Sequence, residues 1–390
     1  MKICAIIAEY NPLHLGHLKH IEYVKSTLGA EKIIVFMSGN FTQRGEVALL
    51  DKFTRARHAV LAGADMVIEL PTVFAIGNAE TFATGAVNLI LSCGIIDGIC
   101  FGVESGTKEE YLSLAKAMLN ESKEFKKALK AQLDKGISLA KAKFEAVKET
   151  YKNDFNPELV NSPNNVLGLE YVKAILKNKS DVNFFIMHRD GDHNDKTLKK
   201  GITSATSIRE TVKTGKFRAV KKCVPPFVFR DIDEYPHSAD KLYLSKILTT
   251  SVEDIAKAPD CTEGLENRIK AFSKDSLTLY ELVEKVSTKR YTKTRVQRIL
   301  SATLLGVTSD FVKDCLNDKL YLKILAVNSS AKDLIPHVCE RAKCTVLTRK
   351  SDVQALKKTA EKCFKIDALA NDIYGLVKDK KTNEYQMLII

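Results

Sequence analysis

The chain has 390 residues, a length that supports about two or three domains, each with its own core. Hydrophobic residues make up 45% and charged residues 28%, as in ordinary globular proteins, and no run reaches the roughly 18 apolar residues of a membrane span, so we expect no membrane association. The net charge of +12 and the isoelectric point near 9.1 favour a polyanionic partner.

The cysteine pattern argues against a secreted protein. The nine cysteines are scattered, with no CxxC pair, so neither a disulfide framework nor a zinc ribbon is expected, and reduced thiols are the simpler interpretation. The amino terminus also lacks a basic segment followed by a long apolar run, which argues against an export signal. We therefore expect a cytoplasmic protein.

The amino-terminal sequence predicts a strand, a tight turn and a helix. Residues 2–8 form a short apolar run, Pro12 biases Asn11 toward an extended conformation and a turn, and apolar residues then recur at helical spacing. The free N–H groups at a helix start attract anions. This unit therefore has the form of a phosphate-binding site.

Two histidines stand at the start of the predicted helix. His14 and His17 lie three positions apart, so both side chains can point at one ligand, and Gly16 lets a nucleotide approach the backbone closely. Imidazole donors against the α-phosphate of ATP would stabilise the charge that grows on its oxygens during in-line attack. The alternatives are two surface histidines or a zinc site. No carboxylate stands at ligand spacing nearby, so we predict no metal ligands from the protein.

A polar loop follows the second predicted strand, which covers residues 32–37. The loop runs from Ser38 to Gly45 and includes Gln43 and Arg44. Loops at the carboxyl ends of parallel strands hold the ligands of open α/β sheets. Because this loop is longer and more polar than a connection needs, a ligand site is favoured over a plain surface turn.

Strands and helices alternate through the first half of the chain. Helices are predicted over residues 52–62 and 79–91, and strands over residues 66–70 and 95–101. Such alternation predicts a parallel, doubly wound α/β sheet. No GxGxxG or Walker A sequence occurs, so the histidine element is the main phosphate-binding candidate of this half. Residues 108–153 are expected to be helical, with lysines on a solvated face.

Further polar segments lie at the ends of predicted elements. Pro163 suits the first position of a helix that begins in the segment 161–171. A fifth strand over residues 182–188 runs into Arg189 and the polar loop 190–195, where a fixed guanidinium would pair with phosphate oxygens. Residues 203–209 open another helix with hydroxyl side chains, which an ordinary helix cap would also explain.

The character of the sequence changes beyond Gly215. A linker or hinge is predicted over residues 216–235, followed by helices to about residue 316 and a small α/β unit without chemistry from residue 320 onward. A basic block without an acid interrupts the helices. Because solvated faces usually mix charge signs, we favour contact with an RNA backbone over a solvated face. The block contains Lys289, Arg290, Lys293, Arg295 and Arg298.

These motifs together resemble one protein family. His14-Leu15-Gly16-His17 matches the HxGH signature of the nucleotidyltransferase superfamily, and residues 203–209 resemble its second signature, Ser-x-[ST]-x-Ile-Arg. The longer string at residues 8–17, with Met37 to Gly45 and the Lys-Arg-Tyr-Thr segment at 289–292, resembles the bacterial tRNA(Met) cytidine acetate ligases. That family activates acetate with ATP and acetylates the wobble cytidine of elongator methionine tRNA.

The resemblance implies a fold, a reaction and a set of residues. It implies a Rossmann-like nucleotidyltransferase domain at residues 1–215 that binds ATP, and a mostly helical tRNA-binding domain at 216–390. His14 and His17 would be catalytic, Mg²⁺ would accompany the triphosphate, and elongator tRNA(Met) and acetate would be the partners, with no protein partner required. The implied ATP-binding residues are Ile7, Ala8, Glu9, Tyr10, Asn11, Pro12, Leu13, His14, Leu15, Gly16, His17, Leu18, Lys19, His20, Gly102, Asn164, Asn165, Arg189, Ser204 and Arg209. The candidates for acetate are Ser38, Asn40 and Gln43, and those for tRNA are the five residues of the basic block.

Two other functions stay open at this point. A small-molecule adenylyltransferase of the same superfamily would not need so long a basic carboxyl-terminal half. A tRNA-binding protein with an inactive nucleotide fold would not need intact His14, Gly16, His17 and Arg209.

Overall fold

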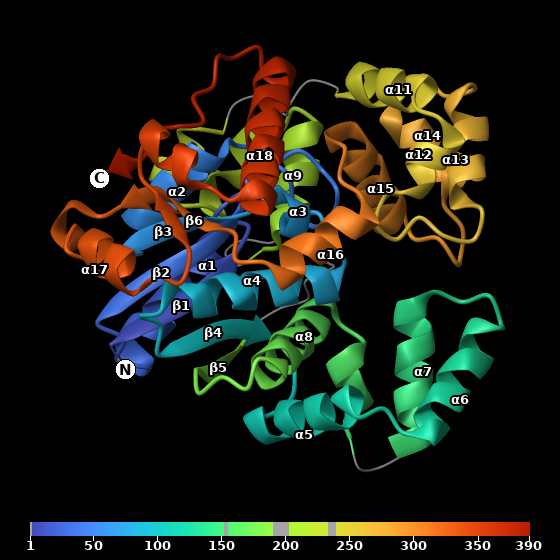
Figure 1. The fold of residues 1–390 in the computed structure, drawn as a ribbon, viewed down its shortest axis with the longest axis horizontal. Coiled ribbons are helices and arrows are strands. Elements are labelled where there is room, and N and C mark those ends of the chain that lie inside the picture. The colour runs from blue at the N-terminus through green and yellow to red at the C-terminus, as the bar shows by residue number, and fades with distance from the viewer. Residues whose placement is uncertain (1, 152–154, 190–202, 233–238) are drawn as a thin grey trace.

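The computed structural model describes residues 2–151, 155–189, 203–232 and 239–390. A mostly parallel sheet runs through the molecule, with its strands in the order β5, β4, β1, β2, β3, β6 and β7, and with β8 beside β6 (Figure 1). Strands β1 to β5 pair in parallel, whereas β6 is antiparallel to β3. The strands are β1 (Ile3–Ala8), β2 (Lys32–Ser38), β3 (Met66–Leu70), β4 (Gly98–Val103), β5 (Asn183–His188), β6 (Tyr321–Val327), β7 (Thr345–Leu347) and β8 (Leu388–Ile389).

Both faces of the sheet are covered by helices. Strand β1 sends Ile3 and Ala5 into one core and Cys4 and Ile6 into the other, because successive side chains of a strand point to opposite faces. This confirms the predicted doubly wound α/β fold. The first core includes α3 (Thr72–Ala75), α4 (Ala79–Cys93), α5 (Lys108–Leu119) and α8 (Pro163–Lys177). The second includes α1 (Leu15–Glu22), the π-helix η1 (Tyr23–Thr27), α2 (Lys52–Leu61) and α9 (Ala205–Lys213).

The helical segment predicted after β4 ends in a hairpin. Helices α6 (Lys123–Leu133) and α7 (Leu139–Tyr151) pack on each other and project from the sheet, and η2 (Pro157–Val160) leads back to α8 (Figure 1). The hairpin buries Phe125 and Ala146 and leaves its lysines on the outer surface.

The segment after Gly215 is part of the second core and not a free linker. It forms η3 (Phe217–Lys222) and α10 (Pro226–Phe229), which bury Val220 and Val228 against the sheet. The carbonyl of Cys223 also accepts a hydrogen bond from the amide of Leu15, at the start of α1 (3.1 Å). Val220, Val224 and Val228 recur every four residues and are buried together in this core. The prolines beside them favoured a linker in the sequence analysis, so this pattern was not recognised.

A group of helices follows at one side of the sheet, as predicted for a mostly helical carboxyl-terminal region (Figure 1). It contains α11 (Asp240–Thr249), α12 (Val252–Ala256), α13 (Leu265–Ser273), α14 (Leu279–Val286), α15 (Lys293–Leu305) and α16 (Ser309–Asn317). Helix α15 lies directly against the loop after β2. The side chain of Ser301 donates to the carbonyl of Gly45 (2.9 Å), and a Cβ on Gly45 would lie 2.4 Å from the backbone nitrogen of Arg298.

The last 70 or so residues extend the central sheet instead of forming a separate α/β unit. The apolar strand β6 completes the edge of β3, because a buried edge strand needs a hydrogen-bonding partner. The predicted domain boundary at residue 215 stays a prediction. Strand β6, which follows that boundary in the chain, pairs with β3 of the amino-terminal half. The remaining elements are η4 (Ser329–Ala331), α17 (Leu334–Arg341), η5 (Lys350–Ala355) and α18 (Lys358–Val377). In the ranges described above, no helix is both long enough and apolar enough to cross a bilayer.

Candidate active site

The turn between β1 and α1 is held by hydrogen bonds from distant segments. The side-chain oxygen of Asn11 accepts from the amide of Leu49 (2.8 Å), and its carbonyl accepts from the guanidinium of Arg209 (2.8 Å). Tyr10 lies in the left-handed region (φ 46°), with a buried ring. The turn therefore has a fixed and partly strained shape, set by α9 and by the segment before α2.

His14 and His17 form a stacked pair at the start of α1. Their ring centroids are 3.8 Å apart, and the edge of Tyr10 packs against His17 at 4.9 Å. Nδ1 of His14 accepts from the amide of Gly16 (3.1 Å), and Nδ1 of His17 accepts from the amide of His14 (3.2 Å). Because each Nδ1 is an acceptor, each neutral ring carries its proton on Nε2. The pair thus presents two N–H donors at a helix N-terminus, which is the arrangement that stabilises an oxyanion.

Gly102 and Arg189 meet on the β4–β5 side of this turn. A Cβ on Gly102 would lie 3.0 Å from Cδ of Arg189, so only glycine leaves space for the arginine there. Burial, and then the guanidinium of Arg189, lower the pKa of His20 to about 4, and Nε2 of His20 lies 3.3 Å from Sγ of Cys100. His20 is therefore a neutral, half-buried group next to β4. The predicted polar loop at residues 190–195 lies outside the described residues.

Glu104, which the sequence did not single out, organises the start of α8. Its carboxylate accepts from the hydroxyl of Ser162 (2.6 Å), the side chain of Asn164 and the amide of Asn165 (3.2 Å). The side chain of Asn165 is buried and bonds to the backbone of Glu104 and Ser105 (2.9 and 3.2 Å). Asn164 is the more accessible of the two predicted asparagines, and Asn165 fixes the loop after β4.

The two halves of the superfamily signature meet at Asn11. Ser204 caps α9 by accepting from the amide of Ser207 (3.1 Å), and Arg209 reaches from the next turn to the carbonyl of Asn11. Residues far apart in the chain thus converge on the histidine turn. Arg209 is 7% exposed, so its guanidinium is held at the wall of the site and is not free in solvent.

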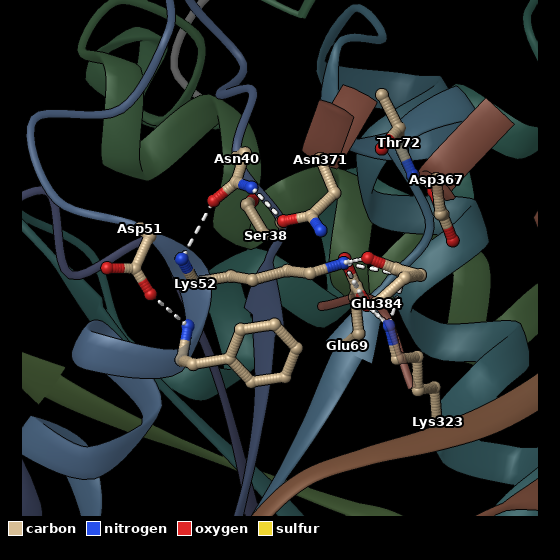
Figure 2. A network of polar contacts seen from close by, with 12 residues as sticks. Ser38, Asn40, Asp51, Lys52, Glu69, Thr72, Lys323, Asp367, Asn371 and Glu384 are labelled. Atoms are coloured by element: carbon tan, nitrogen blue, oxygen red, sulfur yellow. Dashed lines mark hydrogen bonds and ion pairs between the residues drawn. The ribbon is translucent and has the colours of Figure 1, made fainter. Parts of the chain in front are cut away.

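The three acetate candidates differ in accessibility. Ser38 and Asn40 are buried beneath α18, where Asn40 donates to Asn371 (2.9 Å) and accepts from the amide of Lys52 (2.7 Å) (Figure 2). Gln43 is half-buried, and its backbone amide donates to the carboxylate of Glu9 (2.7 Å). A ligand at this loop would reach Gln43 without any movement of α18, whereas Ser38 and Asn40 are already enclosed by protein.

A network of buried charges lies beside Ser38 and Asn40 and includes the end of β3 (Figure 2). Nζ of Lys52 lies 2.7 Å from Glu69 and 2.8 Å from Glu384, and Lys323 bonds to the same two carboxylates. The two lysines balance the two glutamates, and among the described residues no further cation pairs with a third buried carboxylate, Asp367. Burial, and then the carboxylate of Glu69, raise the pKa of Asp367 to about 7.

Sequence reasoning missed this network because its members come from four separate segments. The only available signal was a charged residue inside an apolar strand, as at Glu69 in β3 and Lys323 in β6. Such a residue has to find a partner when both faces of the sheet are covered.

Arg55 is a further buried cation, on the helix predicted over residues 52–62. It is fully buried and donates to the carbonyls of Leu50 (2.9 Å), Glu9 (2.6 Å), Ser38 (3.0 Å) and Gly39. The carbonyls of Glu9, Ser38 and Gly39 lie where β1 and β2 leave the sheet and lose their ladder partners. The guanidinium replaces those partners and holds the two strand ends together.

Two residues of the basic block are partly buried and three are exposed. Arg295 donates to the carbonyl of Asp260 (3.0 Å), and Arg298 lies 3.5 Å from its carboxylate. These two arginines hold the loop before α13 against α15, so they have structural contacts that the sequence did not predict. Lys289, Arg290 and Lys293 are exposed, and two of them form surface ion pairs, Arg290 with Glu263 and Lys293 with Glu284. Acids from other segments therefore accompany a block that contains none in sequence.

Comparison with known proteins agrees with this geometry. A family model described as HIGH Nucleotidyl Transferase matches residues 1–387. The tRNA(Met) cytidine acetate ligase of Acetivibrio thermocellus is 37% identical over 96% of this chain and 94% of its own length. The enzyme of the same name from Clostridium novyi is 36% identical over 97% of this chain and 96% of its own.

The chain belongs to the tRNA(Met) cytidine acetate ligase family. The resemblance inferred from the motifs is thereby confirmed. The apo crystal structure of Thermotoga maritima TmcAL, at 27% identity, covers 100% of both chains with a TM-score of 0.93. A second crystal structure of that protein, bound with alpha-thio ATP, has a TM-score of 0.91. The roles of individual residues in this member of the family stay predictions.

The carbonyl contacts of Arg55 predict a large effect on stability. Arg55→Ala should lower the free energy of unfolding by about 3 kcal/mol or more, because it leaves several buried carbonyls without a donor. Arg57→Ala is the matched control on the same helix. The Arg57 side chain is 44% exposed and pairs with Asp231 alone among the described residues, so its loss should cost about 0.5 kcal/mol or less. Urea unfolding followed by circular dichroism measures both, and equal losses would contradict the assignment.

The position of Asp367 predicts a pH dependence with a definite sign. Its pKa is raised in the folded chain from an ordinary value near 3.8 to about 7. The protonated form therefore adds stability that is fully present below about pH 4 and is lost as the pH rises through 7. Asp367→Asn, which stays uncharged, should gain melting temperature relative to wild type between pH 5 and pH 8.

The control for this experiment is Asp310→Asn, at a side chain that is 91% exposed. Its melting difference from wild type should stay constant over the same range. Melting temperatures would be measured by differential scanning calorimetry. If the difference between Asp367→Asn and the wild type is also constant with pH, the pKa of Asp367 is not raised in the folded protein.

Proposed function

We propose that this protein is an ATP-dependent ligase that converts acetate to acetyl-adenylate and transfers the acetyl group to the wobble cytidine of elongator tRNA(Met), forming N4-acetylcytidine. The observation that carries the proposal is the convergence of both signature halves on one turn. His14 and His17 present Nε2–H donors there, and Arg209 bonds to the carbonyl of Asn11. The names of the relatives from Acetivibrio thermocellus and Clostridium novyi supply the identity of the acid and of the tRNA.

The first step requires an electrophilic α-phosphorus held against the helix start. A carboxylate oxygen of acetate attacks it in line, the bond to the β-phosphate oxygen breaks, and pyrophosphate leaves. Negative charge grows on the phosphate oxygens during this displacement, and the preorganised donors of His14 and His17 oppose it. In the second step the exocyclic amine of the cytidine attacks the acyl carbon, loses a proton and displaces AMP.

The nucleotide would lie along the carboxyl ends of β1 and β4. Residues 7–20 would hold the phosphates, Gly102 and Asn164 would border the nucleoside, and Arg189 and Arg209 would contact the triphosphate. Mg²⁺ would accompany the triphosphate, which is its usual ligand in nucleotide-binding sites. In the described ranges no cluster of three histidine, cysteine, aspartate or glutamate side chains is arranged to hold a metal. We expect the reaction to take place in the cytoplasm, without a further protein subunit.

Exchange of labelled pyrophosphate into ATP tests the proposal against its alternatives. A ligase of this kind should show exchange only when acetate is present, and nucleoside analysis of methionine tRNA should then detect acetylcytidine. An adenylyltransferase that uses a phosphate acceptor would show exchange without acetate. A tRNA-binding protein with an inactive nucleotide fold would show none.

The histidine pair gives a catalytic prediction. His17→Asn keeps an oxygen that can accept the amide of His14 but removes the Nε2–H donor, so acetate-dependent exchange should fall about a hundredfold while the melting temperature changes little. His17→Ala should show the same loss of rate and, because the amide of His14 loses its acceptor, a lower melting temperature. An unchanged rate in folded His17→Asn would refute the catalytic role.

The exposed lysines of the basic block give a prediction for tRNA. Lys289→Glu combined with Lys293→Glu should abolish acetylation but leave acetate-dependent exchange intact, because adenylate formation needs only the histidine turn. Filter binding over a salt series should show the slope of affinity against salt fall by about one unit for each lost phosphate contact.

The control variant changes the net charge by the same amount, at the opposite end of the sheet. Lys332→Glu and Lys343→Glu lie at exposed positions on either side of α17, far from α15 in Figure 1. Their combination should bind tRNA like the wild type. If exchange falls together with tRNA binding in the α15 variant, the block supports the first domain and the division of labour is wrong.

A further inference from the structure

The loop after β2 forms a short, rigid hairpin around Arg44. Phe41 and Val47 form a β-bridge, the amide of Thr42 donates to the carbonyl of Glu46 (3.0 Å), and the amide of Gly45 returns to Thr42 (2.8 Å). We call residues 41–47 the β2 hairpin.

Three outside contacts fix the β2 hairpin in place. The amide of Gln43 is bonded to the carboxylate of Glu9 (2.7 Å), which ties the tip to the end of β1. Gly45, at φ +72°, lies against the backbone of α15, and its carbonyl accepts from Ser301 (2.9 Å). Arg44 is therefore carried at a defined position between the histidine turn and α15.

The side chain of Arg44 is half-buried yet has no ion pair and no hydrogen bond within the described part of the chain. The nearby carboxylates are engaged elsewhere. Glu46 lies 3.9 Å from Arg209 and accepts from the side chain of Gln297 (3.1 Å), and Glu9 accepts the amide of Gln43.

The surroundings of Arg44 make its charge unfavourable in the free protein. Burial, and then the guanidinium of Arg209, lower the pKa of Arg44 below its usual value. Two guanidinium groups are held near each other, and one of them has no partner among the described residues, so binding an anion between them is expected to be favourable. A partly desolvated, unpaired cation beside proposed catalytic residues is typical of a binding group and not of a stabilising one.

We propose that Arg44 binds an oxyanion of the substrates, either the carboxylate of the acid or a phosphate of the nucleotide, from the β2 side of the histidine turn. This proposal rests on the proposed function. Ser38 and Asn40 of the same loop are enclosed by α18, so Arg44 is the cation that this loop offers to a ligand. The planar guanidinium can take two oxygens of either group at once.

The test compares Arg44→Gln and Arg44→Lys with Arg349→Gln, which removes an arginine whose side chain is 79% exposed beyond β7. Arg44→Gln should weaken the binding of one substrate about ten- to a hundredfold, as expected for a lost charge-assisted hydrogen bond. Arg44→Lys, which keeps the charge but not the fork, should fall between Arg44→Gln and the wild type. The melting temperature of Arg44→Gln should stay equal or rise, because an unpaired cation has been removed, and Arg349→Gln should behave as wild type.

Two measurements identify the oxyanion. A higher KM for acetate in pyrophosphate exchange, with unchanged ATP affinity by calorimetry, assigns the carboxylate. Weaker ATP binding with unchanged KM for acetate assigns a phosphate. Wild-type values of both, or a loss of binding that parallels a fall in melting temperature, would overturn the role of Arg44. Failure of the proposed function is distinguishable, because the wild type itself would then lack acetate-dependent exchange, while the ATP titration of the Arg44 variants would still decide whether Arg44 binds a phosphate.

Discussion

The guanidinium of Arg55 supplies donors to a set of carbonyls that the sheet itself cannot satisfy. Strands β1 and β2 end side by side, and the backbone at Glu9, Ser38 and Gly39 turns away from the ladder into the loops that line the candidate site. A buried carbonyl without a donor is costly, so these turns need a partner from elsewhere. Arg55 provides it from the first turn of α2, and Arg209 does the same for Asn11 from α9. The shape of the histidine turn therefore depends on two arginines that are distant from it in sequence.

The carboxyl-terminal segment completes the same edge of the sheet. Lys323 of β6 and Glu384 join Lys52 and Glu69 in a balanced set of two cations and two anions (Figure 2). A buried set of this kind is tolerable only when every charge has a partner, which explains why an additional carboxyl, Asp367, favours its protonated form. The network also decides which part of the loop after β2 can meet a ligand. The first residues of this loop are buried, whereas Gln43 and Arg44 at its tip are half-buried.

The β2 hairpin lies between the two proposed binding regions. One side contacts the end of β1 through Glu9 and Gln43, and the other lies against α15, which begins within the basic block. This close packing has a consequence for the proposed reaction, since an adenylate has to be delivered to an RNA base before water reaches it. A rigid spacer of a few residues keeps the distance between the two regions constant, and Gly45 permits the contact because any side chain would collide with α15.

The sequence alone determined the features that depend on local order. The strand–turn–helix at His14 and His17, the alternation that makes a doubly wound sheet, and the motifs shared with the ligase family are all contained in contiguous residues, where hydrophobic period and turn chemistry act. Only the tertiary structure decided which charged residues are buried together. Arg55 and Asp367 look like ordinary polar positions in sequence, and the charges of Glu69 and Lys323 inside apolar strands do not say which partners they meet. Those partners lie in segments up to about 300 residues away. The burial of Ser38 and Asn40, the return of β6 to the first sheet and the packing of α15 on Gly45 have the same cause. Long-range contacts are set by how the elements pack together, and a local pattern carries no record of its distant partner.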